Sequence, residues 1–398
     1  MLRQGVQERK LDTMHKVQLA PKGRSVLRKL QVQKHIWAIL VIAGLAFSTA
    51  EFNHHIGKFG VSLLWLVLCL NFNNIWEEFK TDKGPKWVWI PMLVIGLSAV
   101  GHLVAEWSAN NLMAVLLVAL CYGYYLLSRR LPGLSMALVL LGIYASVQLI
   151  INRIDLTTHH LSLCGVYHIA MAIIVVGMFL SPIRFRPLSW TLGAVALLIS
   201  GSEEGLICLG LFVVIALIKR DWTKSALVPI GLCLVVMAIY APVGYFQSVY
   251  TRLNSERFAL NGTLDERMEN ITHERWLSYV ETFTEANWVL GEGWAWNSVG
   301  SAEADLYDDI ELWQTAHNVP IRITGHIGIF AGLAWFLIFI YAWLKSWRSK
   351  WLYVWTCILF VAMIDHFLWT YIVVLPFILL GLQKKEEYHD AFNNCANL

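Results

Sequence analysis

The sequence predicts an all-α, polytopic integral membrane protein with about twelve transmembrane helices and one large extracytoplasmic loop between spans nine and ten. Hydrophobic residues make up 57% of the 398 residues and charged residues only 15%, whereas a typical soluble domain has about 25% charged residues. Twelve apolar segments have lengths near the roughly 17–25 residues that a helix needs to cross a bilayer. The composition therefore excludes an ordinary soluble protein and a disordered one.

The chain opens with residues 1–34, a basic segment with nine Lys and Arg that predicts a cytoplasmic N-terminus. A secretory signal peptide cleaved near Ala50 is an alternative for the first apolar segment, but the basic region of such a peptide is usually short. Spans one to nine are predicted within residues 35–246, at 35–51, 57–73, 87–106, 111–128, 133–151, 161–180, 187–202, 204–219 and 226–246. Two pairs of spans are short and closely spaced, one around Gly201–Gly205 and the other around Asp365, and each pair could also form a tight hairpin or a broken helix.

Residues 247–317 interrupt the series of short loops and are predicted to form a separate loop domain. Such a long loop is usually functional or disordered, and its many aromatic residues favour a folded structure. Apolar residues at 276, 279, 280 and 283 have the spacing of one helix face and predict a helix over 274–285. Trp288, Trp294, Trp296 and Trp313 could stack on sugars or anchor the loop at the membrane surface.

Residues 318–383 contain the last three predicted spans, at 324–344, 351–365 and 367–383, and residues 384–398 form a predicted cytoplasmic tail. The distribution of positive charge supports this series. With the N-terminus in the cytoplasm, 24 of the 31 Lys and Arg fall in cytoplasmic segments and 7 on the other side. Because positive residues are enriched in cytoplasmic loops, both termini are predicted to be cytoplasmic.

The few arginines on the outer side are candidate anion-binding residues, since the planar guanidinium suits phosphate. Arg153 follows the fifth span in a short loop, where the phosphate of a lipid-linked substrate would lie, although Asp155 could pair with it. Arg275 begins the predicted loop helix. For Arg267 and its neighbours a surface ion pair is the favoured interpretation, because the loop contains 13 Asp and Glu.

His317 and Asn318 end the large loop. A neutral His is a competent general base near pH 7 without a metal, although a His before a helix can also be a cap or a surface residue. His159 and His160 are adjacent but lack the further ligands that a metal site needs. The seven cysteines have no CxxC spacing, and no phosphate-binding glycine loop or hydrolase motif is present. We therefore expect no cofactor, no metal and no nucleic-acid partner.

Taken with the twelve predicted spans, two motifs resemble the O-antigen ligase and O-antigen polymerase superfamily. Arg275-Trp276 precedes Gly291-Glu292-Gly293, which is similar to the family's Arg, amphipathic helix and Gly-x-Gly. His317-Asn318 is followed after nine residues by Gly328, similar to the family's H-N-x9-G-x-x-G/T/Y pattern. The last position of that pattern is Ala331 here, with Gly332 beside it.

The resemblance implies a GT-C-like glycosyltransferase at the periplasmic face of the bacterial inner membrane. Its donor would be an undecaprenyl-pyrophosphate-linked glycan and its acceptor a sugar hydroxyl of lipid A–core, in a monomer embedded in membrane lipids. His317 would act as the base and Arg275 would stabilise the pyrophosphate charge. Arg153, Arg267, Asn318 and Arg322 would bind substrate, and the transfer would be metal-independent and would invert the anomeric configuration.

The sequence departs from the resemblance in one place. Many family members have a Ser-Arg-Gly-like motif entering span eight, where this chain has Ser202-Glu203-Glu204-Gly205, so no phosphate contact is assigned there. Two alternatives remain open. A polymerase of the same superfamily would transfer the glycan to another lipid-linked repeat unit. A transporter of lipid-linked sugars is the other alternative, and its sequence would be expected to consist of two inverted halves.

Overall fold

The computed structural model describes residues 21–48, 54–81, 86–154, 167–199, 287–293, 319–364 and 374–396, with Cys208, Leu211 and Ile215. Every regular element in these ranges is a helix. Trp87–Ala105, Asn111–Arg130 and Leu134–Ile151 are each long and apolar enough to cross a membrane, and a bent helix pair would make a fourth span. These helices confirm the predicted class of an all-helical membrane protein, whereas the twelve-span topology and the domain boundaries stay predictions.

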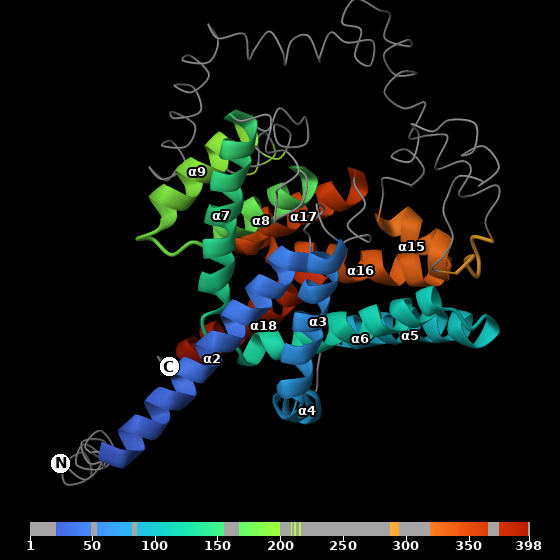
Figure 1. Ribbon diagram of the computed structural model, residues 1–398, viewed down its shortest axis with the longest axis horizontal. Coiled ribbons are helices and arrows are strands. Elements are labelled where there is room, and N and C mark those ends of the chain that lie inside the picture. The colour runs from blue at the N-terminus through green and yellow to red at the C-terminus, as the bar shows by residue number, and fades with distance from the viewer. Residues whose placement is uncertain are drawn as a thin grey trace, which may run out of the picture.

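The helices occur in the following order: α2 (Pro21–Ser48), α3 (His54–Leu70), α4 (Phe72–Thr81), α5 (Lys86–Ala105), α6 (Ala109–Arg130), α7 (Leu134–Ile154), α8 (Tyr167–Leu180), α9 (Arg186–Ile199), α15 (Val319–Ile327), α16 (Ile329–Lys345), the short 3-10 helix η3 (Ser346–Arg348), α17 (Trp351–Ile364) and α18 (Val374–Ala396). In Figure 1, α5, α6 and α16 run side by side, and α7 crosses their direction. Helix α18 packs against α6, and α8 and α9 pack against α7.

The core lies where α6, α16, α17 and α18 meet, and large aromatic side chains fill it. Phe339 is fully buried, with its ring centroid 5.7 Å from that of Trp355 and 5.4 Å from that of Phe377. The indole N–H of Trp355 donates to the Gln383 amide oxygen at 2.6 Å, so the polar group of this side chain is satisfied inside the apolar core. This core holds α16 in the helical bundle.

Two predicted spans differ from the helices observed. The segment predicted as a span over 57–73 ends as α3 at Leu70, and the chain then bends by 62° into α4. The segment predicted over 324–344 is interrupted at Gly328, where α15 ends and α16 begins. Asn71, Asn73 and Asn74 mark the first break in the sequence. Hydropathy does not detect the second break, because apolar residues lie on both sides of Gly328. Helix α18 also continues to Ala396, so the predicted cytoplasmic tail begins as part of a helix.

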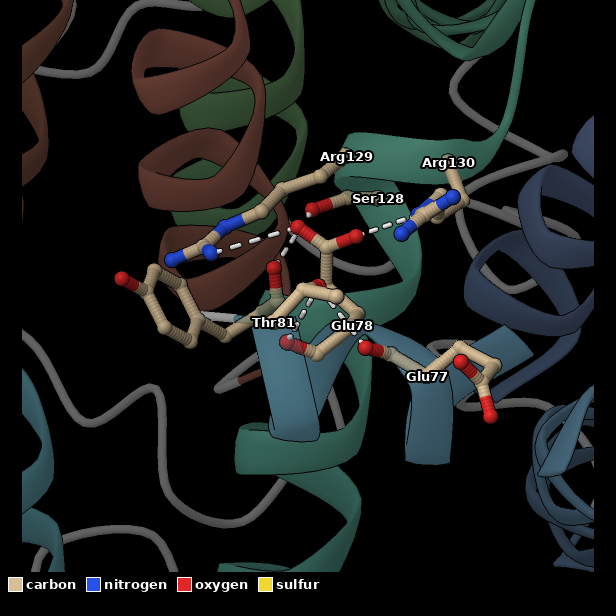
Figure 2. Close-up of polar contacts among 7 residues, drawn as sticks. Glu77, Glu78, Thr81, Ser128, Arg129 and Arg130 are labelled. Atoms are coloured by element: carbon tan, nitrogen blue, oxygen red, sulfur yellow. Dashed lines mark hydrogen bonds and ion pairs between the residues drawn. The ribbon is translucent and has the colours of Figure 1, made fainter. Parts of the chain in front are cut away.

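A cluster of charged side chains holds α4 against the last turn of α6. Glu78 forms ion pairs with Arg130 and, at 3.4 Å, with Arg129, as Figure 2 shows. The Arg129 side chain is only 4% exposed, and its guanidinium lies 4.2 Å from the centre of the Tyr125 ring. Glu78, Arg129 and Arg130, which these contacts bring together, all lie in segments that the sequence predicts to be cytoplasmic.

Helix α18 joins the same polar end of α6. Lys385 donates to the Leu131 carbonyl oxygen at 3.3 Å, and Glu386 pairs with Lys350 at 2.6 Å. All the basic residues in these contacts belong to loops predicted to be cytoplasmic. Asn111 lies at the other end of α6, about 27 Å away at 1.5 Å per residue, which is close to the thickness of the hydrocarbon core.

Loss of Glu78 is expected to destabilise the protein far more than loss of Glu77. Removing one partner of a buried ion pair costs about 3–5 kcal/mol because the other charge is left in the interior. Glu77 pairs with Lys80 on the surface, where both side chains are more than half exposed, and such pairs contribute about 0–1 kcal/mol. Thermal unfolding of Glu78→Ala and Glu77→Ala in detergent measures the difference. Equal melting temperatures for the two variants would contradict a stabilising role for the cluster.

Candidate functional site

The segment 287–293 lies against the point where α15 ends and α16 begins, as Figure 1 shows. Three backbone hydrogen bonds connect the two. The N–H of Glu292 donates to the Gly325 carbonyl at 2.8 Å, and that of Gly293 to the His326 carbonyl at 2.9 Å. The N–H of Ile329 donates in the other direction, to the Trp288 carbonyl at 2.9 Å. Segment 287–293, which belongs to the predicted large loop, is thereby tied to the end of α15 and the start of α16. We call this contact the glycine junction (287–293 with 325–329).

Three glycines make the junction possible. Gly291, Gly293 and Gly328 have φ values of 86°, 88° and 89°, which other residues rarely adopt. Space is also limiting, since a Cβ at Gly291 would lie 2.6 Å from the Gly328 nitrogen. A Cβ at Gly328 would lie 2.5 Å from the Val289 carbonyl oxygen. The two motifs that carried the resemblance, Gly-x-Gly and the glycine after His317-Asn318, are therefore in direct backbone contact.

Side chains of α5 and α15 complete the glycine junction. The His102 ring nitrogen Nε2 lies 2.6 Å from the Leu290 carbonyl oxygen, and the Ser98 hydroxyl donates to the Ile327 carbonyl. His326 is 3% exposed, and its Nδ1 lies 3.0 Å from the Gly293 carbonyl oxygen. Asn111 at the start of α6 faces Gly293, where an added Cβ would lie 3.2 Å from its side-chain oxygen. The junction thus connects the loop to α5, α6 and α15.

Helix α15 is formed and ended by identifiable residues. Pro320 lies in its first turn, where a missing N–H costs no hydrogen bond. Gly328 ends the helix with a φ of 89° and a ψ of 163°, a backbone conformation that glycine adopts readily because it has no Cβ. Ile323 and Ile327 face a small apolar cavity of about 40 Å³ that is also lined by residues of α5, α6, α16 and α18. This apolar packing fixes one side of α15 in the bundle.

Two of the six predicted site residues lie in described helices, and the other four do not. Arg322 lies in α15, and Arg153 is the second-to-last residue of α7. His317 and Asn318 immediately precede α15 in the sequence but lie outside the described residues, as do Arg267 and Arg275. The catalytic and binding roles assigned to these six residues therefore stay predictions. Among the described residues, no three His, Cys, Asp or Glu side chains gather closely enough to hold a metal ion.

His102, Asn111 and His326 were not among the site residues predicted from the sequence. His102 and His326 were both placed inside predicted spans, and Asn111 was taken as the first residue of another. A signal was nevertheless present, because polar side chains inside apolar helices are unusual and default to a functional hypothesis. His326 also lies two residues before Gly328, within the motif that begins at His317-Asn318.

Comparison with known protein families supports the resemblance. Residues 188–336 match the family model described as O-Antigen ligase. No curated protein matches the chain. The matched residues include both glycine segments of the junction and the His317-Asn318 pair that lies between them. The match confirms, over residues 188–336, the predicted resemblance to the O-antigen ligase superfamily.

Proposed function

We propose that this protein transfers a glycan from undecaprenyl pyrophosphate to a sugar hydroxyl of lipid A–core, at the periplasmic face of the inner membrane. The observation that carries the proposal is the family match over residues 188–336. The glycine junction supports it, because it joins two short motifs that are each weak alone. An orientation with both termini in the cytoplasm would put the loop and the junction on the periplasmic side.

The proposed reaction needs a base and a group that stabilises negative charge. The acceptor hydroxyl attacks the anomeric carbon, its proton passes to His317, and the bond from that carbon to the pyrophosphate oxygen breaks. Undecaprenyl pyrophosphate leaves, and direct attack inverts the anomeric configuration. A pyrophosphate is already a good leaving group, so positioned cations are sufficient to stabilise the charge that develops on it. Arg275 takes this role, with Arg153, Arg267 and Arg322 as further phosphate contacts and Asn318 as a hydrogen-bonding group.

The position of α15 supports the role of His317. His317 precedes the first residue of α15 by two positions, and the other end of that helix is fixed by the glycine junction. The helix has 9 residues and is therefore about 13 Å long at 1.5 Å per residue. A base close in sequence to a fixed helix can be held in one place, and precise placement supplies a large part of a catalytic rate.

A null strain that carries a plasmid-borne wild-type copy tests the proposal. For a ligase, gel analysis of lipopolysaccharide from the null strain should show core without attached glycan, while long lipid-linked chains accumulate. The wild-type copy should restore the ladder. Core that bears a single repeat unit would instead identify a polymerase. An unchanged ladder in the null strain would exclude glycan transfer in this pathway and favour the transporter hypothesis.

A further inference from the structure

Helix α4 carries a row of exposed aromatic side chains that the proposed function does not use. Phe72, Trp76 and Phe79 are spaced i, i+4 and i+7 and therefore line one face of the helix. Their rings are nearly parallel, with centroids 6.3 Å apart for the first pair and 5.6 Å for the second. The three residues are 59%, 46% and 49% exposed. We call this row the aromatic ridge.

The other faces of α4 have identified environments. Glu78 binds Arg129 and Arg130 at the end of α6, and Ile75 packs against the core. Glu77 lies about 140° around the helix from the centre of the aromatic ridge at 3.6 residues per turn, and its side chain is 61% exposed. The helix thus has one side on the bundle, one polar side in water, and an apolar side that nothing in the described residues covers.

The direction of α4 relative to α6 indicates where the apolar side of α4 lies relative to the membrane. Helix α6 includes the candidate span Asn111–Arg130, and α4 contacts its last turn. In Figure 1, α4 is seen nearly along its axis while α6 runs across the view, so the two helices cross steeply. If α6 crosses the bilayer, α4 lies close to the plane of the membrane, at the depth of Arg129 and Arg130.

We propose that α4 is an interfacial helix that inserts the aromatic ridge into the phospholipid leaflet at the end of α6. Amphipathic helices of this kind lie between headgroups and acyl chains, and Trp is enriched at that depth. Lys80 lies with its ammonium 5.3 Å from the centre of the Trp76 ring, where it can reach lipid phosphates while its stem covers apolar surface. The preceding helix α3 also exposes apolar side chains, since Leu66 and Leu70 are 51% and 60% exposed.

Photo-crosslinking of the full-length protein in phosphatidylethanolamine and phosphatidylglycerol vesicles tests this proposal. The photoreactive residue p-benzoylphenylalanine is introduced at Trp76 in one variant and at Phe79 in a second. The matched control carries it at Glu77, one residue away on the opposite face. Mass spectrometry then measures phospholipid adducts of the α4 peptide. We expect several-fold more adduct at positions 76 and 79 than at 77.

Two outcomes would overturn the proposal. Equal lipid adducts at the three positions would show that the aromatic ridge does not enter the bilayer. Crosslinks from position 76 or 79 to a second copy of this chain, in place of lipid, would identify the ridge as a protein interface. Because two positions on the ridge carry the probe independently, a single variant that fails to insert leaves the test intact. Neither outcome depends on glycan transfer.

Discussion

Replacing His317 with alanine is expected to lower the rate of glycan transfer by about 10²–10⁴-fold, the usual contribution of a positioned general base. The base acts only while the acceptor loses its proton. The loss should therefore appear in kcat, with little change in KM. Purified protein in vesicles, supplied with lipid-linked donor and lipid A–core acceptor, provides the measurement.

His35→Ala is the matched control for this experiment. His35 is an exposed residue of α2 and lies outside residues 188–336. It should retain wild-type transfer. A His317→Ala protein that is expressed at the wild-type level and transfers glycan at the wild-type rate would remove His317 as the base. The family assignment would be unaffected, and the search for the base would turn to other residues of the matched region.

The second large effect is expected from Gly328→Ala. Alanine at the φ of 89° and ψ of 163° that Gly328 adopts costs roughly 1–3 kcal/mol, and overpacking adds about 1–3 kcal/mol. The new methyl group would lie 2.5 Å from the Val289 carbonyl oxygen and 3.0 Å from the Leu290 backbone. Segment 287–293 must therefore move away from the junction, and we expect transfer activity to be largely lost.

Hydrogen–deuterium exchange distinguishes this local effect from general unfolding. In Gly328→Ala the amides of Glu292 and Gly293, which donate to Gly325 and His326, should exchange faster, while α6 keeps its protection. Gly101→Ala provides the control, because no atom lies within 4 Å of a Cβ added at Gly101. Alanine is also favoured over glycine inside a helix. Wild-type activity in a Gly328→Ala protein whose Glu292 and Gly293 amides exchange faster would show that the junction is not required.

The sequence predicted the class of the protein because that class depends on composition and on the order of charges. The loops predicted to be cytoplasmic include Arg129, Arg130, Lys350 and Lys385, and the structure places these residues at one end of α6. Hydropathy could not show where an apolar stretch bends or breaks. The amphipathic spacing of 72, 76 and 79 was visible in the sequence and could have separated α4 from the preceding span.

The glycine junction could not be derived from the sequence, since it pairs backbone segments more than 30 residues apart. Backbone hydrogen bonds do not depend on particular side chains and therefore leave little trace in the sequence. The glycines that it needs were noticed only as parts of a resemblance. The departure at Ala331 has a simple structural explanation. Ala331 is fully buried, and a Cβ at Gly332 would collide with the Thr324 hydroxyl. Both positions therefore require small residues where α16 passes α15.

Since the junction holds Glu292 against Gly325, the chain between them leaves and returns at one place. A closed segment of this kind can change in length at little thermodynamic cost, because doubling a flexible loop adds only about 0.6 kcal/mol of closure entropy. Residues 294–316 can therefore gain or lose residues during evolution without disturbing the bundle.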